Sequence, residues 1–342
     1  MPGIARLLSV LCPAVLGLAV LAGAPVPASA QETGAVRVAQ QFGIAYLPFL
    51  VVREQRLIER FTREQGLPEP RVEWVQVSGA AAMNDGLVSG TLDLVSAGVG
   101  PMILVWSRTR ANLRVRGVVA LGSMPNYLLT TNPAVRTLAD FTERDRIALP
   151  AARVGFQAFV LQMAAEQSFG PGQHGRLDPL VVSMAHPDGL AALLSARSEV
   201  TAHFTSPPYS NIERRDPRVH QVLSSFDVLG GPHTFNVVYA SGVFRDANPR
   251  TFRAIVQGFD AAMAWINASP HDAAELYRRA EGGNLTVAQI EEIITAPDTR
   301  FTIVPESVMR FADFQFRAGL IRERPANWQE LFFPEIHDRS GS

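Results

Sequence analysis

The order of apolar and polar positions along the chain divides it into short and long segments. Short apolar runs, some with every second position polar, are typical of buried strands. Between them lie longer stretches with apolar residues three and four positions apart, as in helices that bury one face. The expected strands are 36–39, 72–77, 92–97, 116–121, 127–131, 147–149, 180–184, 200–205, 219–224 and 235–240. The expected helices among them are 48–65, 80–89, 155–169 and 187–196, with others opening near 98–101 and 207–209.

The last third of the chain is expected to be helical. Asn248-Pro249 and Ser269-Pro270 each place a capping residue before a proline that suits the first turn, and Thr286 can cap a third helix. Strands that alternate with helices predict an α/β fold with helices on both faces of its sheets. No low-complexity linker separates the two groups of strands, which favours two lobes joined by crossing segments, with a cleft between them.

The first thirty residues have the pattern of a secretory signal peptide. Arg6 precedes the apolar run 7–21, and Ala28-Ser29-Ala30 has the small-x-small form of a cleavage site. We expect export to a bacterial periplasm with cleavage after Ala30, and the alternative is an uncleaved membrane anchor. Cys12 is the only cysteine and lies in this segment, so the mature chain would contain no disulfide.

Composition excludes several kinds of chemistry. The 342 residues carry a net charge of −1, so nucleic acid is not an expected partner. All 31 basic residues are arginine, and without lysine there is no Schiff base, pyridoxal phosphate anchor or Walker lysine. The formal G-x-G-x-x-G match at 170–175 contains Pro171, and no helix is expected to begin there. The seven histidines show no metal-ligand spacing, and no G-x-S-x-G elbow exists. We therefore expect no enzyme activity, catalytic residue, metal or cofactor.

Four stretches carry a resemblance to a known family. They are GIAYLPFLVVREQRLIER (43–60), LVSGTLDLVSAGVGPM (87–102), HFTSPPY (203–209) and FRDANPRTFRAIVQGFDAAMAWINASPHDAA (244–274). In this order and spacing they resemble the periplasmic solute-binding proteins of the nitrate, sulfonate, taurine and thiamine-precursor group of ABC importers. The similarity covers nearly the whole mature chain.

The resemblance implies a two-lobed binding-protein fold of type II, with a mixed sheet flanked by helices in each lobe and a ligand cleft between the lobes. Residues 31–122 and 243–342 would form lobe one and residues 123–242 lobe two. The chain would cross near 123–127 and again near 241–244.

The function that the resemblance implies is delivery of a small solute to an ABC permease and its ATPase by a monomeric periplasmic protein. A sulfonate-, taurine- or nitrate-like anion and a pyrimidine-type heterocycle are both open as ligands. Two alternative functions also stay open: an enzyme of the thiamine-pyrimidine synthase type on the same fold, and a ligand-sensing partner of a membrane receptor.

The candidate ligand-binding residues follow strands, begin helices or lead to the second crossing. Phe42 and Tyr46 would either stack on a flat ligand or close the core. His203 stands where many relatives carry aspartate, and a lone strand histidine is more often a hydrogen-bonded core residue. Asp93 matches an aspartate of the family motif and is expected to be structural. The full candidate set is Phe42, Tyr46, Ser78, Gly79, Ala80, Ala97, Gly98, Gln157, His203, Thr205, Ser206, Tyr209, Phe235 and Asn236.

Overall fold

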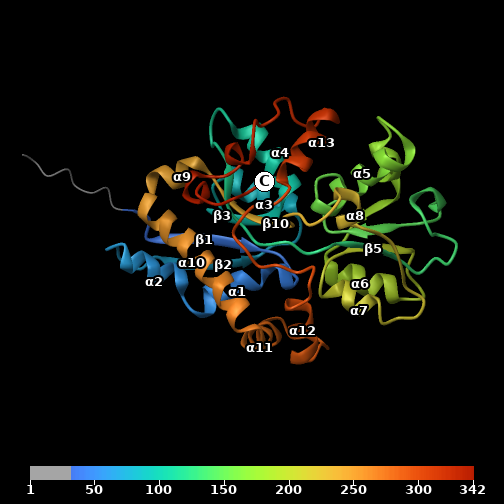
Figure 1. Cartoon of the computed structure of the whole chain (residues 1–342), viewed down its shortest axis with the longest axis horizontal. Coiled ribbons are helices and arrows are strands. Elements are labelled where there is room, and N and C mark those ends of the chain that lie inside the picture. Colours follow the sequence, from blue (N-terminus) through green and yellow to red (C-terminus); the bar gives the residue numbers. More distant parts are fainter. Residues whose placement is uncertain (1–31) are drawn as a thin grey trace, which may run out of the picture. The chain divides into compact units, whose positions relative to one another are not determined.

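A computed structural model describes residues 32–342, in which ten strands form two five-stranded mixed sheets (Figure 1). The expected signal peptide, residues 1–30, lies outside the described residues. The first sheet has the order β2-β1-β3-β10-β4, with β1 at Ala35–Gln40, β2 at Arg71–Gln76, β3 at Leu94–Gly98, β4 at Arg116–Ala120 and β10 at Asn236–Ala240. The second has the order β7-β6-β8-β5-β9, with β5 at Tyr127–Thr130, β6 at Ile147–Leu149, β7 at Val181–Ser183, β8 at Ala202–Thr205 and β9 at His220–Ser224.

Each sheet contains one strand that runs against its neighbours. In the first sheet β10 is antiparallel to β3 and β4, and in the second β5 is antiparallel to β8 and β9. Both are the first strand formed after the chain passes from one sheet to the other. The fold class expected from the sequence, an α/β chain with two mixed sheets, is therefore what the structure has.

The position of β10 corrects one expected boundary. We expected residues 123–242 to form the second lobe and the chain to cross back near 241–244. Instead β10 pairs with β3 and β4, so the chain has returned to the first sheet by Asn236. The first crossing falls between β4 and β5, as expected. The division into lobes remains a prediction, now with its second crossing between β9 and β10.

Helices cover both sheets. In the first part they are α1 (Leu47–Glu54), α2 (Leu57–Glu64), α3 (Ala80–Val88) and α4 (Val99–Thr109). Around the second sheet they are α5 (Phe156–Phe169), α6 (His186–Leu194), α7 (Tyr209–Glu213) and α8 (Ser225–Leu229). The last helices are α9 (Gly242–Ala247), α10 (Pro249–Ala268), α11 (Pro270–Glu281), α12 (Val287–Ile294) and α13 (Val308–Arg317). Short 3₁₀ helices lie at Ile44–Tyr46 (η1), Leu138–Asp140 (η2), His174–Leu180 (η3), Trp328–Glu330 (η4) and Pro334–Ile336 (η5).

The packing of these helices follows their apolar faces. The long α10 packs on α1 and α2, and α11 packs on α12 (Figure 1). Around the second sheet, α5 packs with α8 and α6 with α7, and the view in Figure 1 shows these pairs on opposite sides of β5. None of the helices within residues 32–342 combines the length and apolar character needed to cross a bilayer.

Two local expectations were wrong. The stretch 48–65 is two helices rather than one, because Arg56 adopts a left-handed backbone (φ 50°) and interrupts the hydrogen-bond ladder between α1 and α2. A 3₁₀ helix does begin at His174, inside the G-x-G-x-x-G match. It contains Pro179 and follows the end of α5, so the strand–turn–helix context of a dinucleotide site is still missing.

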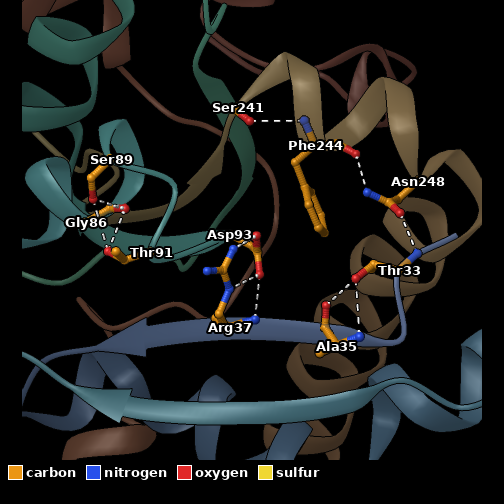
Figure 2. Close-up of polar contacts among 10 residues, drawn as sticks. All are labelled: Thr33, Ala35, Arg37, Gly86, Ser89, Thr91, Asp93, Ser241, Phe244 and Asn248. Carbon is orange, nitrogen blue, oxygen red and sulfur yellow. Dashed lines mark hydrogen bonds and ion pairs between the residues drawn. The ribbon is translucent and has the colours of Figure 1, made fainter.

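Asp93, the residue before β3, joins that strand to β1, in line with its expected structural role (Figure 2). Its carboxylate accepts from the backbone N–H of Arg37 at 2.8 Å and from the Arg37 guanidinium at 2.9 and 2.7 Å. The same view shows Asn248, the residue before α10, donating to the Phe244 carbonyl and accepting from the Thr33 backbone. These contacts join the start of the described chain to the helices at its end.

Candidate functional site

One pocket draws its lining from segments of both sheets. Most lining residues follow the carboxyl ends of parallel strands or begin the next helix, which is where open α/β sheets bind ligands. They are Gln41, Phe42, Tyr46, Ala80, Ala97, Gly98, Pro150, Ala151, Gly155, Phe156, Gln157, His186, Ser206, Phe235 and Asn236. The cavity volume is about 30 Å³, far below the roughly 300–1,000 Å³ of pockets that hold small-molecule ligands. A solute larger than a few atoms therefore requires the pocket walls to separate.

Three of the helices that begin at this pocket begin at a glycine. The residues before the first turns of α3, α4 and α5 are Gly79, Gly98 and Gly155, none of which offers a side-chain cap. First-turn N–H groups have no acceptor within their own helix, and the positive end of the helix dipole adds to their attraction for anions. At α4 the Val99 N–H already donates to the Phe235 carbonyl at 3.1 Å and Pro101 has no N–H, so the backbone donors that favour an anion or a carbonyl oxygen come mainly from the starts of α3 and α5.

Gly98, at the end of β3, and Gly100, in the first turn of α4, allow α4 to approach α5 closely. A Cβ at Gly98 would lie 2.4 Å from Cβ of Phe156, and a Cβ at Gly100 would lie 2.3 Å from Cδ2 of Phe159. Phe156 also meets the Phe235 ring edge-on, with 4.7 Å between ring centroids. The back of the pocket is therefore a direct packing contact between segments of the two sheets.

Asn236 supplies an unpaired donor at the start of β10. The residue is 2% exposed, and its amide nitrogen Nδ2 has no hydrogen-bond partner among the described residues. A buried amide N–H without a partner costs about 1–3 kcal/mol relative to a paired one. Because Asn236 lines the pocket, a ligand oxygen would remove this cost.

The pocket is lined without formal charge. No arginine, aspartate or glutamate is among its lining residues. Recognition must therefore rest on neutral donors, aromatic faces and helix ends. Tyr46 is only 5% exposed and its ring contacts Phe49 in the core, so it serves both packing and the pocket wall. Burial raises the pKa of the Tyr46 hydroxyl, which keeps it protonated.

The architecture has many counterparts among solved structures. One is the alkanesulfonate-binding protein SsuA from Xanthomonas axonopodis pv. citri bound to MOPS, with a TM-score of 0.65 and 18% identity, covering 86% of this chain and 96% of that one. The nitrate-binding protein NrtA from Synechocystis PCC 6803 has a TM-score of 0.66 and 13% identity, covering 87% of this chain and 84% of that one. The sulphonate-binding protein SsuA from Escherichia coli has a TM-score of 0.61 and 17% identity, with coverages of 88% and 92%.

The chain has the fold of the periplasmic binding proteins. No family model matches the sequence, and no curated protein matches it either. At these identities the similarity establishes the shared fold and leaves the ligand to the residues of the pocket.

Nine residues predicted from the sequence line the pocket of this binding-protein fold. They are Phe42, Tyr46, Ala80, Ala97, Gly98, Gln157, Ser206, Phe235 and Asn236. They were found because the ends of strands and the starts of helices can be located in a sequence. That these residues contact a ligand stays a prediction.

Two predicted residues before α3 lie outside the lining. The N–H of Gly79 donates to Gln41 Oε1 at 3.0 Å, so this donor is already satisfied. Ser78 precedes it and is also absent from the lining. Gly79 has a positive φ of 85°, and a Cβ there would lie 3.1 Å from the Pro150 carbonyl oxygen. The loop thus has a packing role beside the pocket.

Three predicted residues near β8 also lie outside the lining. Thr205 is fully buried, and its hydroxyl lies 3.5 Å from the carbonyl of Ser206. The Tyr209 ring stacks on His186, with centroids 5.4 Å apart and planes 27° apart. His203 is fully buried and lies behind His186, so it reaches the pocket only through that ring.

A continuous row of side chains runs from the pocket into the second sheet, and we call it the Glu213–His203–His186 chain. His186 Nδ1 lies 3.1 Å from His203 Nε2, and His203 Nδ1 lies 2.5 Å from Glu213 Oε1. At the pocket end, His186 Nε2 lies 3.3 Å from Gln157 Nε2 and 3.4 Å from Ser206 Oγ. His203 and Glu213 are fully buried and His186 is 6% exposed.

Burial sets the charge of this chain. It raises the pKa of Glu213 to about 9 and lowers that of His203 to about 3. Burial, and then the neighbouring His203, lower the pKa of His186 well below its ordinary value. These shifts agree that the buried contact is a neutral carboxyl–imidazole hydrogen bond rather than an ion pair.

The sequence analysis missed six lining residues: Gln41, Pro150, Ala151, Gly155, Phe156 and His186. His186 begins a helix directly after a strand, so the criterion that selected Gln157 applies to it as well. The expected start of that helix at Pro187 left His186 outside it. A group of three or more His, Asp, Glu or Cys side chains able to surround a metal ion is not found within residues 32–342.

Proposed function

We propose that this chain is a solute-binding protein that captures a small anion and delivers it to an ABC importer. The observation that carries the proposal is the unpaired Nδ2 of Asn236 in a pocket where α3, α4 and α5 begin. Asn236 and the starts of α3 and α5 supply hydrogen-bond donors, and none of these features supplies a formal positive charge. Such a site suits a singly charged oxyanion, whose oxygens only accept hydrogen bonds.

The similar structures support this ligand class. They include proteins described as binding nitrate, alkanesulfonate and MOPS, itself a sulfonate. A pyrimidine-type heterocycle is the competing ligand, because Phe42, Tyr46 and Phe156 offer ring faces. We favour the anion because a heterocycle with its own N–H donors would leave some of the pocket's donors unpaired.

The partners follow from the function. We propose an ABC permease with its ATPase as the receiving complex, and periplasmic residence after cleavage behind Ala30. N-terminal sequencing of exported protein should then begin at Gln31, and an intact chain in the membrane fraction would contradict export with cleavage.

A hydrolase is the second candidate, because Ser206 Oγ faces His186 Nε2 at 3.4 Å and that ring continues to His203 and Glu213. In such a row Ser206 would be the nucleophile, His186 the base, and His203, held by Glu213, the group that orients the base. We favour binding, because the serine contact is long and the fold is shared with solute-binding proteins. Hydrolysis of p-nitrophenyl acetate that disappears in Ser206→Ala would favour the hydrolase instead.

The proposal is tested by a thermal-shift screen. Nitrate, methanesulfonate, taurine and uracil are each added at increasing concentration. A ligand at a hundred times its Kd stabilises the folded state by about 2.7 kcal/mol, which is a shift of several degrees. We expect a saturable rise with nitrate or a sulfonate. A rise with uracil alone would replace the anion with a heterocycle, and ligand turnover would replace binding with catalysis.

A further inference from the structure

The Glu213–His203–His186 chain can hold only a limited number of protons. Each of its two internal contacts needs one proton, because a hydrogen bond has one donor and one acceptor. A third proton can sit at the outer end, on His186 Nε2. The other free position is Glu213 Oε2, which is buried without a partner, so an O–H there would be unsatisfied.

The third proton determines whether His186 Nε2 presents a hydrogen-bond donor or an acceptor to the pocket. With it, Glu213 donates to His203, His203 donates to His186, and His186 presents an N–H to the pocket; the chain is neutral. Without it, the same contacts reverse, His186 Nε2 presents a lone pair, and Glu213 is a buried carboxylate. Gln157 Nε2, at 3.3 Å, could then donate to His186.

We infer that anion binding in this pocket is coupled to one proton, held by the Glu213–His203–His186 chain, whose presence turns His186 into a donor toward the ligand. The inference rests on the proposed function. It adds His186 as a residue that sets specificity, and the proton as a second ligand whose binding is linked to that of the anion. His186 would contact the anion. His203 and Glu213 would act through His186 as positioning residues.

The residues around Glu213 and His203 favour the neutral, three-proton form of the Glu213–His203–His186 chain. Within residues 32–342 no arginine forms an ion pair with Glu213, and Arg214 and Arg215, which directly follow α7, are exposed. The neighbours of His203 across β5 and β6 are the apolar Leu129 and Ala148. An unpaired buried carboxylate is costly in such a setting.

The other ionisable neighbours do not supply a counter-charge. Tyr209 stacks on His186, and Glu281 of α11 acts on Tyr209, whose pKa is raised by its burial and by that carboxylate. Asp188 on α6 is exposed. None of the three has a hydrogen bond to Glu213, His203 or His186 among the described contacts.

The chain is built into the packing of the second sheet. A Cβ at Gly189 of α6 would lie 2.6 Å from His203 Nε2, so a glycine is needed for the imidazole of β8 to reach the helix that carries His186. Glu213 comes from α7, which packs on α6. The three side chains thus come from three elements and meet only in the folded protein.

Calorimetry in buffers of different ionisation enthalpy tests the coupling, because it counts protons taken up per ligand bound. The probes are sodium nitrate and sodium methanesulfonate, which stay ionised between pH 7 and pH 10. Since the pKa of Glu213 is raised to about 9, we expect uptake near zero at pH 7 and near one at pH 10. Affinity should fall about tenfold between pH 8 and pH 10. Wild-type protein alone gives this result, so no variant has to fold.

Glu213→Gln provides the matched variant. Glutamine keeps the neutral donor toward His203 and cannot lose its proton, so the anion affinity of the variant, whatever its value at pH 7, should not decline toward pH 10. Binding with no proton uptake at pH 10 would overturn the inference and leave the proposed function intact. If neither anion binds at any pH, the anion class and the inference both fail.

Discussion

At the scale of single residues, the buried carboxyl of Glu213 has consequences for stability that need no ligand. Its pKa in the folded protein is about 9, against an ordinary value of 4.5. Between these values the folded state holds a proton that the unfolded state has released, so the free energy of unfolding declines as pH rises. The buried histidines act in the opposite direction at low pH, because burial lowers the pKa of His203 to about 3 and the unfolded chain binds protons first.

Glu213→Gln should remove the alkaline part of this profile. We expect the variant to gain stability relative to wild type as pH rises from 5 to 8, because its side chain is neutral throughout. Chemical denaturation at several pH values measures the difference. Glu64→Gln, at an exposed carboxylate paired with Arg60, is a matched control and should show no comparable gain. A constant offset between wild type and Glu213→Gln from pH 5 to pH 8 would show that Glu213 is ionised in the folded state.

His186 and His203 also show the limit to which the place of a single residue relative to the pocket can be predicted from the sequence. The sequence suggested His203 as a candidate contact, whereas the structure buries it behind His186. Their relation depends on the close approach of Gly189 to β8, a tertiary contact that no spacing in the chain reveals. Asn236 was predicted correctly as lining, because it begins the strand that precedes the last helices.

At the scale of elements, the strands were predictable to within about two residues, because apolar runs and turn residues define them locally. Their partners were less predictable. The family resemblance implied that β10 belongs to the second lobe, although it joins β3 and β4 of the first sheet. The prediction of a single helix over 48–65 failed for a local reason. Arg56 has a left-handed backbone, and the sequence gives no sign of this because arginine ordinarily favours a right-handed helix.

Near the pocket, the packing of α4 against α5 is the contact that we expect to be most sensitive to substitution. A methyl group at Gly98 would overlap Phe156, at 2.4 Å between the two Cβ atoms. Gly98→Ala should therefore push the start of α5 away from β3, weakening ligand binding at least tenfold and costing about 1–3 kcal/mol of stability. Gly34→Ala, where a Cβ meets nothing within 4 Å, is the control. Binding and stability equal to wild type in Gly98→Ala would show that this contact does not shape the pocket.

At the scale of the whole described chain, the two sheets share one feature of topology: a single antiparallel strand in each sheet. Each receives its antiparallel strand immediately after the chain crosses, which brings the carboxyl ends of β1, β3, β6 and β8 to a common pocket. Alternation of strands and helices predicts such an α/β fold. Which loops meet, and what they bind, depends on how the two sheets pack, and only the structure places Asn236 near Gln157 and His186.

The central claim is that one small anion is held by donors from both sheets. Titration calorimetry with the anion selected by the screen, on wild type, Asn236→Ala and Gln157→Ala, tests it most directly. Asn236 comes from the first sheet and Gln157 from the helix that covers the second, with Gln173→Ala as an exposed amide control. Loss of one hydrogen-bond donor to the ligand costs about 1–3 kcal/mol, so each pocket variant should bind roughly 5- to 150-fold more weakly while still folding, and Gln173→Ala should bind as wild type does. Wild-type affinity in both pocket variants, or loss of binding in Gln173→Ala, would contradict the account.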